Sequence, residues 1–179
     1  MTETKNRTVG RSFRIREQWL NALDEEAQRQ RTTSNALIND ILRDYCLFDR
    51  YFKRLDAIAM TQRTISRFAE TCPKEKLDEI AKNAGSNIAL DLFRSMGLRF
   101  NFEDSMFFVT EIMGEHANWF KCEQYLVKNN HILHLRHNLG ENWSIYITEV
   151  VSTLLEACCS RKVKREIIDG AVTLEVPMT

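Results

Sequence analysis

Apolar and polar side chains alternate near the start of the chain and predict a short β-strand over residues 11–16. Phe13 and Ile15 would form its apolar face. Its polar face would consist of Ser12, Arg14 and Arg16. No neighbouring segment has a strand pattern, and a lone strand leaves its backbone groups unpaired. We therefore expect this strand to pair with the same strand of a second copy across a two-fold axis.

Two helical patterns follow the strand. The first has an apolar stripe made of Trp19, Leu20, Leu23 and Ala27. After a pause at residues 30–34, the second has a stripe made of Leu37, Ile38, Ile41, Leu42 and Tyr45. Thr32 or Thr33 can cap this second helix, because a hydroxyl oxygen there accepts from a free helix amide.

This order of strand, helix, turn and helix resembles the ribbon-helix-helix family, which includes the Arc and methionine repressors. The resemblance covers residues 10–46 and rests on Ser-Phe-Arg-Ile-Arg-Glu-Gln-Trp-Leu from Ser12 and Thr-Thr-Ser-Asn-Ala-Leu-Ile from Thr32. It implies a homodimer whose core is closed by Phe13 and Ile15. The polar face of the strand would then enter the major groove of double-stranded DNA.

The resemblance also implies a role for each polar position. The residues expected to contact DNA bases are Ser12, Arg14 and Arg16. Those expected to contact phosphates are Lys5, Arg7, Arg11, Thr33, Ser34 and Asn35. Members of the family often have Leu and Gly where this chain has Gln30 and Arg31. Either the turn between the helices differs in shape, or Arg31 adopts an unusual backbone conformation.

The distribution of charge agrees with a basic N-terminal surface, although the net charge of the 179-residue chain is zero. Residues 1–54 contain 11 Lys/Arg and 8 Asp/Glu, while residues 55–179 contain 14 and 17. Residues 5–16 contain five cations and no acid, which is typical of a phosphate-docking surface. The alternative is a solvated arm without a partner.

Apolar residues continue at helical spacing from Phe48 to Phe68 and predict a connector helix over residues 48–72 that ends before Pro73. We therefore expect three parts. Residues 1–47 would be the ribbon-helix-helix domain, residues 48–72 the connector, and residues 73–179 an α+β regulatory or oligomerisation domain.

The third part begins with helical patterns over residues 74–119, interrupted at Gly97, with the last helix starting at Asp104 or Ser105. Two strand patterns then flank Asn129-Asn130, and this two-residue loop would pair Glu123 with Arg136, Tyr125 with His134, Leu126 with Leu133 and Cys122 with His137. A helix from Asn142 to Cys159 comes next. Two closing strands, Val163 to Ile168 and Ala171 to Val176, surround Asp169-Gly170.

The domain is therefore predicted to be α+β, with helices followed by a small antiparallel sheet in the order ββαββ. This order is similar to that of sensory domains related to vinyl reductases and to the trafficking protein Bet3. The similarity implies a domain that encloses a ligand or forms a dimer.

Candidate chemistry in this domain is limited to histidines and cysteines. Cys122 and His137 would be neighbours in the predicted hairpin and are the candidates for a transition metal. Adjacent Cys158 and Cys159 raise the alternative of a redox switch, against ordinary roles in the core. No nucleotide-binding, hydrolase or zinc-ribbon motif occurs, so we expect no enzyme activity, no cofactor and no metal.

Together these patterns predict a cytoplasmic, prokaryotic transcription regulator, such as a repressor, that binds DNA as a homodimer. Its C-terminal domain would sense a small-molecule effector or control assembly, and pairing of dimers into tetramers stays open. The alternatives are an antitoxin or partition protein with the same DNA-binding module, and an enzyme or haem protein with a DNA-binding head. No stretch is apolar enough to span a membrane, and the first residues are not those of a signal peptide.

Overall fold

The computed structural model describes residues 8–52, 58–168 and 170–178. The chain divides into two compact units, Met1–Tyr45 and Cys46–Thr179. None of the described helices is both long enough and apolar enough to cross a membrane.

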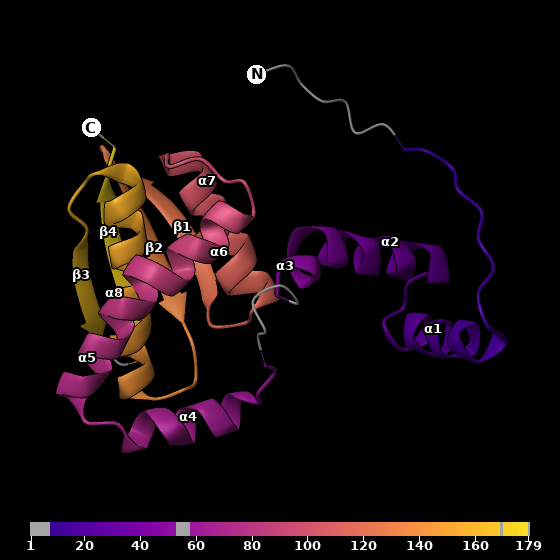
Figure 1. The fold of residues 1–179 in the computed structure, drawn as a ribbon, viewed down its shortest axis with the longest axis horizontal. Coiled ribbons are helices and arrows are strands. Elements are labelled where there is room, and N and C mark those ends of the chain that lie inside the picture. The colour runs from indigo at the N-terminus through magenta and orange to yellow at the C-terminus, as the bar shows by residue number, and fades with distance from the viewer. Residues whose placement is uncertain (1–7, 53–57, 169, 179) are drawn as a thin grey trace. The chain divides into compact units, whose positions relative to one another are not determined.

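The N-terminal unit contains the two predicted helices, α1 (Glu17–Arg29) and α2 (Ser34–Asp44), which pack against each other (Figure 1). Thr33 is the N-cap of α2, and its hydroxyl oxygen accepts from the Ala36 amide at 3.2 Å. Both helices and this cap are confirmed. Residues 8–16 form neither a helix nor a strand within the single chain, so the ribbon stays a prediction.

The turn between α1 and α2 depends on a left-handed residue. Arg31 has a φ of 55°. The amide of Thr32 donates to the carbonyl of Ala27 at 2.9 Å, and the amide of Arg31 donates to the carbonyl of Gln28 at 3.1 Å. These bonds form a Schellman motif, in which glycine usually occupies the left-handed position. Arg31 therefore adopts the unusual backbone conformation, which was one of the two outcomes expected from the sequence.

We expect substitutions at Arg31 to separate the steric cost of this turn from the role of the side chain. Arg31→Gly should stabilise the N-terminal unit by up to about 1 kcal/mol, because glycine adopts a positive φ without a clash. Arg31→Val should destabilise it by about 1–2 kcal/mol, because a β-branched residue fits poorly there. Hydrogen exchange of the α1 and α2 amides measures both effects. Equal protection in the two variants would show that the turn adapts freely.

The predicted connector helix over residues 48–72 is wrong as a continuous element. A wide helical turn, η1 (Tyr45–Asp49), leads into the short α3 (Arg50–Phe52), and α4 (Gln62–Thr71) begins separately. Residues 58–60 have no regular structure, and residues 53–57 lie outside the described part of the chain. The break has a local cause, because the Thr61 hydroxyl accepts from the Thr64 amide at 3.3 Å and starts a new helix.

Helices α5 (Lys74–Asn83), η3 (Ala84–Ile88) and α6 (Ala89–Ser95) follow in succession. Helix α6 ends at Ser95, and Gly97 just beyond it, with a φ of 73°, confirms the predicted stop. The next helix, α7 (Phe102–Phe107) with η4 (Phe108–His116), starts earlier than predicted. Its N-cap is Asn101, whose side chain accepts from the Asp104 amide at 2.8 Å, so Asp104 lies in the first turn.

Four strands form one antiparallel sheet in the order β1-β2-β4-β3. Their bounds are Lys121–Val127, Asn130–Arg136, Lys164–Ile168 and Ala171–Pro177, for β1, β2, β3 and β4 respectively. With the 19-residue α8 (Glu141–Cys159), they confirm the ββαββ order and the α+β class. In the β3–β4 turn, Asp169 lies outside the described residues and Gly170 has a φ of 78°.

The predicted register of the β1–β2 hairpin is wrong by two residues. Glu123 lies opposite His134, Cys122 opposite Leu135 and Leu126 opposite His131. The two-residue loop is Lys128-Asn129, with Lys128 at a φ of 55°, rather than Asn129-Asn130. The Glu123–Arg136 ion pair and the Tyr125–His134 ring contact still form, as diagonal neighbours.

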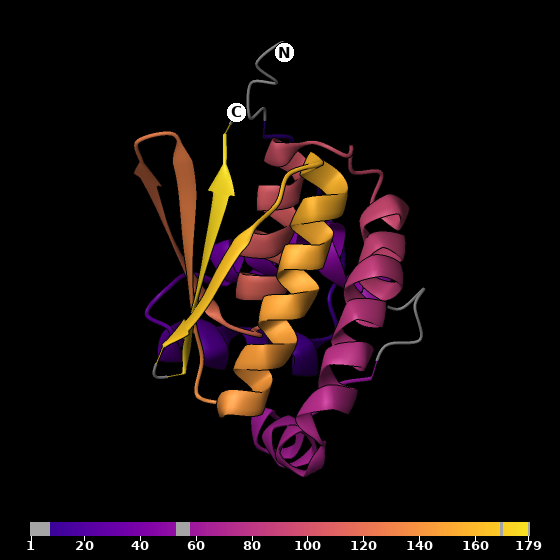
Figure 2. The ribbon, with the colours of Figure 1, turned by 90° about the vertical axis from the view of Figure 1, so that its left-hand side faces the viewer.

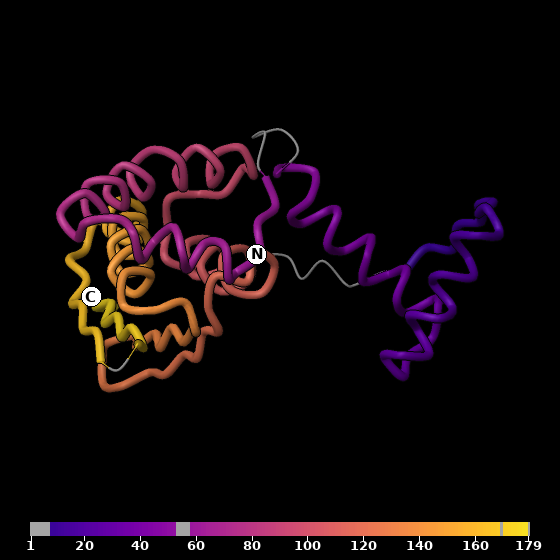
Figure 3. Tube along the Cα trace, turned by 90° about the horizontal axis from the view of Figure 1, so that it is seen from below, coloured from indigo at the N-terminus to yellow at the C-terminus, as the bar shows by residue number. Residues whose placement is uncertain are grey.

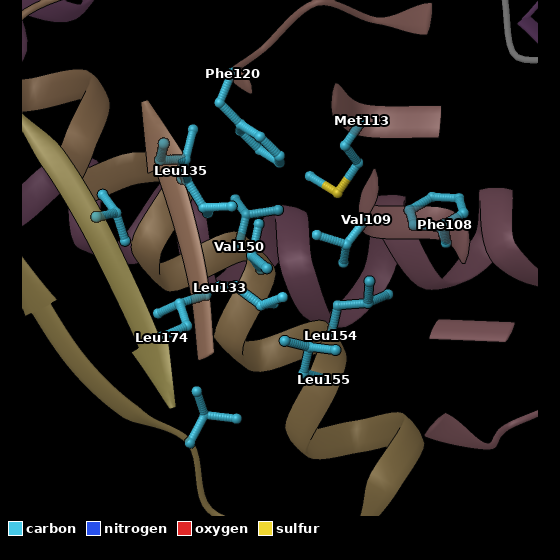
Figure 4. Packing of buried hydrophobic residues seen from close by; sticks show 14 of the residues in the cluster. Phe108, Val109, Met113, Phe120, Leu133, Leu135, Val150, Leu154, Leu155 and Leu174 are labelled. Atoms are coloured by element: carbon cyan, nitrogen blue, oxygen red, sulfur yellow. The ribbon is translucent and has the colours of Figure 1, made fainter. Parts of the chain in front are cut away.

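The core of the C-terminal unit lies between the sheet and the helices. Helices α8 and η4 contact the sheet, and α5 and η3 pack on α8 (Figures 2 and 3). Leu133, Leu135 and Leu174 point from the sheet towards Val150 and Leu154 of α8 (Figure 4). Residues that alternate with these leucines along the strands, such as His134, Arg136 and Thr173, point to the other face of the sheet.

Candidate functional site

The expected DNA-reading side chains lie in the extended segment before α1. Ser12, Arg14 and Arg16 are exposed, as is Arg11, whereas Lys5 and Arg7 lie outside the described residues. Arg16 has an extended backbone, and its guanidinium lies 4.9 Å from the centre of the Trp19 ring. Within the described part of this unit, the ion pairs are Arg29–Glu26 and Arg43–Asp44. The arginines at 11, 14 and 16 therefore keep their charge available to a partner.

The expected phosphate-binding residues lie together at the start of α2. The amides of Ser34 and Asn35 occupy the first two helical positions and have no acceptor within the helix. The hydroxyls are already engaged, because Thr33 caps the helix and Ser34 donates to the Asp24 carboxylate of α1. A phosphate at this end would therefore bind backbone amides, close to the negative charge of Asp24.

Large apolar side chains remain open on the N-terminal unit. Phe13 is 62% exposed and Trp19 54% exposed, and several apolar residues of the two helices are also exposed, namely Leu20, Ile41, Leu42 and Tyr45. Within residues 8–45, Ala27 and Leu37 are the buried residues. A unit this small buries too little apolar surface to be stable by itself. The apolar stripes in the sequence had predicted that these exposed side chains belong to a hydrophobic core.

The structure does not bring the two candidate metal ligands together. Cys122 lies opposite Leu135, and burial raises the pKa of its thiol to about 11. His137 has both ring nitrogens in use, because Nδ1 accepts from the Leu139 amide at 3.1 Å and Nε2 lies 3.0 Å from the Ser144 hydroxyl. Among the described residues, no group of three or more His, Cys, Asp or Glu side chains is arranged to hold a metal ion.

The pair Cys158 and Cys159 has little thiolate character, because burial raises the pKa of both thiols. Cys158 is buried in the core of the C-terminal unit, and the Cys159 sulfur lies 4.0 Å from the Ser105 hydroxyl. A redox switch requires an accessible thiol of low pKa. These two residues therefore fit the ordinary packing role better.

We expect thiol labelling to follow this difference in environment. Cys46 is exposed, whereas Cys122 is half-buried with a pKa of about 11. At pH 8 iodoacetamide should label Cys46 at least about tenfold faster, because the thiolate is the reactive form. Raising the pH towards 11 should narrow the gap. Mass spectrometry of the labelled peptides measures both rates, and equal rates at pH 8 would contradict the assigned burial of Cys122.

The sequence did not reveal an apolar cavity of about 290 Å³ inside the C-terminal unit. Its walls come from η3, α6, η4 and α8, with Phe52 of α3 at one side. Ile88, Leu92, Met113 and Val150 provide aliphatic wall, while Phe108, Trp119 and Tyr146 provide rings. Charged side chains are absent from the described residues that line it. Met113, Phe108 and Val150 are seen in Figure 4.

The side chain of Tyr146 lines this cavity. Tyr146 stacks on Trp143 with ring centres 5.0 Å apart and lies 5.9 Å from Trp119. Trp143 Nε1 donates to the Trp119 carbonyl at 3.2 Å, so that indole is satisfied. No described group forms a hydrogen bond with the Tyr146 hydroxyl, and burial raises its pKa. Burial therefore favours the neutral hydroxyl, which has no hydrogen-bond partner among the described residues.

A second, larger hollow of about 810 Å³ adjoins the cavity. The two share Phe52, Ala117, Trp119 and Tyr146. The larger hollow also has polar side chains on its walls, namely Asp49, Gln62 and His116. Gln62 donates to the Asn118 carbonyl at 3.1 Å, while the ring of His116 stacks on Phe48 at 5.4 Å. The apolar cavity thus connects to a wider, more polar hollow.

These features define two candidate sites, a basic extended segment with its open apolar neighbours and a partly open apolar cavity. No family model, curated protein or solved structure matches this chain. What the chain does is therefore inferred from the residues and geometry described above.

Proposed function

We propose that the protein is a DNA-binding transcription regulator that acts as a homodimer through its N-terminal unit. The observation that carries the proposal is the coincidence of two features in that unit. Unneutralised arginines line the segment before α1, and large apolar side chains of the same segment and of both helices stay open. A second copy would cover the apolar side chains and leave the arginines facing outwards.

Alternation along residues 11–16 supports this arrangement. Phe13 and Ile15 would pack beneath a two-stranded ribbon against α1 and α2, while Arg14 at its centre would reach the base edges. A two-stranded ribbon fits the major groove, and Arg bonds to the O6 and N7 atoms of guanine in pairs. Because each protomer supplies one strand, the bound DNA would contain two equivalent half-sites.

The C-terminal unit is proposed to regulate this binding through a ligand or through assembly. Its extensive core and its apolar cavity support a regulatory domain more than a disordered antitoxin segment. Within the described residues, no group of three or more His, Cys, Asp or Glu side chains could hold a metal ion. We place the protein in the cytoplasm, where its DNA partner would be.

The proposal is tested by comparing two alanine variants in DNA binding. Arg14→Ala should lose about 1–3 kcal/mol per half-site and relax the preference at one position of that half-site, because a base contact is removed. Lys5→Ala should weaken binding to all sequences alike and flatten the dependence of log affinity on log salt by about one unit per lost phosphate contact. A binding selection and a salt titration on both variants measure these effects.

The reverse result would overturn the assignment. If Lys5→Ala changes the selected motif while Arg14→Ala does not, the strand presents its other face. Arg43→Ala is the matched control for loss of a cation, because Arg43 lies on α2 and pairs with Asp44. Its motif should equal that of the wild type. If no form binds DNA above background, the N-terminal unit binds protein instead.

A further inference from the structure

We infer that the apolar cavity of the C-terminal unit is a binding site for a neutral aromatic molecule of one or two rings that carries one hydroxyl or similar hydrogen-bonding group. The inference deepens the proposed regulatory role and rests on it for its biological meaning. Binding itself depends on the cavity alone.

The size of the cavity sets the size of the ligand. An apolar cavity of about 150 Å³ holds benzene in another protein. At about 290 Å³, this cavity has room for two fused rings. Ligand sites in general begin near about 300 Å³ and have mostly apolar walls. A ligand that binds this cavity only in the folded state stabilises the folded unit.

The chemistry of the walls sets the class of the ligand. With no charged side chain among its described lining residues, the cavity would leave a phosphate or a carboxylate without a partner, which is costly. Rings from Phe108, Trp119 and Tyr146 offer faces and edges on which another ring can stack. The Met113 thioether is also on the wall, and sulfur contacts aromatic rings favourably.

The Tyr146 hydroxyl supplies the polar contact. The Tyr146 side chain lines both the cavity and the wider hollow, and its hydroxyl forms no hydrogen bond with any described group. The same side chain is held in place by stacking on Trp143, which is itself fixed by its bond to the Trp119 carbonyl. A ligand with one hydroxyl would pair with it and be oriented with its rings inwards.

The test is calorimetric titration of the full chain with 1-naphthol, with its isostere 1-methylnaphthalene, and with 1-decanol as an aliphatic alcohol. We expect 1-naphthol to bind tightest. Tyr146→Phe should weaken 1-naphthol about three- to tenfold, as expected for one lost hydrogen bond, and leave 1-methylnaphthalene within about twofold. Tyr125→Phe is the matched control, because its hydroxyl bonds to Glu123 at 2.7 Å, outside the cavity, and should change neither affinity.

A second variant tests the location. Ala89→Phe places a ring in the cavity and should abolish binding of both bicyclic probes, while Ala157→Phe, on an exposed position of α8, should not. A rise in the melting temperature with 1-naphthol, absent in Ala89→Phe, checks the same point if calorimetric signals are small. Tighter binding of 1-decanol, or no binding of any probe to folded wild type, would overturn the inference.

Failure of this site is distinguishable from failure of the proposed DNA binding. Ligand binding without DNA binding would remove the regulatory meaning and leave the site intact. DNA binding without ligand binding would remove the site and leave the proposed function intact. If both occur, 1-naphthol should change the affinity for DNA of the wild type and not that of Ala89→Phe.

Discussion

Phe13→Asp is expected to abolish dimerisation and DNA binding while the C-terminal unit stays folded. Phe13 is 62% exposed in the single chain and would be buried beneath the ribbon of the dimer. Removing a buried Phe costs about 3–5 kcal/mol, and an unpaired carboxylate in the same place costs more. Because each dimer contains two copies, dimerisation should weaken by more than about a hundredfold. Sedimentation equilibrium measures this loss directly.

The neighbouring residue provides the control for charge. Ser12→Asp introduces the same carboxylate on the opposite face of the segment, where it is exposed. It should leave the dimer intact and weaken DNA binding, because a negative charge would face the phosphates and base edges. If Phe13→Asp remains a dimer while Ser12→Asp dissociates, the faces of the strand are exchanged.

Gly85→Ala is expected to destabilise the C-terminal unit by about 1–2 kcal/mol, although alanine normally stabilises a helix relative to glycine. A Cβ atom at position 85 would lie 2.9 Å from both the Val150 carbonyl oxygen and the Thr153 Cβ of α8. The contact with backbone cannot be relieved by rotating a side chain, so η3 and α8 must separate. Urea unfolding followed by circular dichroism measures the change in unfolding free energy.

Gly10→Ala is the matched control, because nothing lies within 4 Å of a Cβ atom built at position 10. Its unfolding free energy should stay within about 0.5 kcal/mol of the wild type, as for most surface substitutions. A Gly85→Ala protein as stable as Gly10→Ala would mean that η3 and α8 are not in close contact.

Elements with a strong period were predictable from the sequence. Helices α1, α2 and α8 and the β3–β4 hairpin each have an apolar stripe or an alternation in the sequence, and each forms close to its predicted bounds. The register of the β1–β2 hairpin was not predictable from the sequence, because a shift of two residues keeps every side chain on its predicted face. Adjacent Asn129 and Asn130 suited either loop, and the Glu123–Arg136 pair forms in both registers.

Neither the break in the connector helix nor the cavity could be predicted from the spacing of apolar residues. Apolar spacing continues past residues 58–60, yet the Thr61 cap starts a new helix there. Among the residues that line the cavity, Phe52, Leu92, Met113 and Tyr146 come from four separate elements. Each of them fits a core pattern in the sequence, and a core pattern does not say where packing leaves space.

The apolar stripes of the N-terminal unit, in contrast, were predictable from the sequence, whereas their exposure in the single chain is visible only in the structure. Their stripes predicted burial, but Trp19 and Ile41 stay about half exposed in the single chain. A second chain would cover these side chains, which is why dimerisation and DNA binding are proposed together.

Selection of bound sequences from random double-stranded DNA by the full-length wild-type protein decides between the proposed regulator and a protein-binding module. The proposed dimer predicts an enriched motif with two-fold symmetry, in which each half-site contains a guanine that loses its preference in Arg14→Ala. A selection that enriches no sequence, at a salt concentration where the protein is a dimer, would contradict DNA reading by the N-terminal unit. An enriched motif without two-fold symmetry would contradict the paired strands.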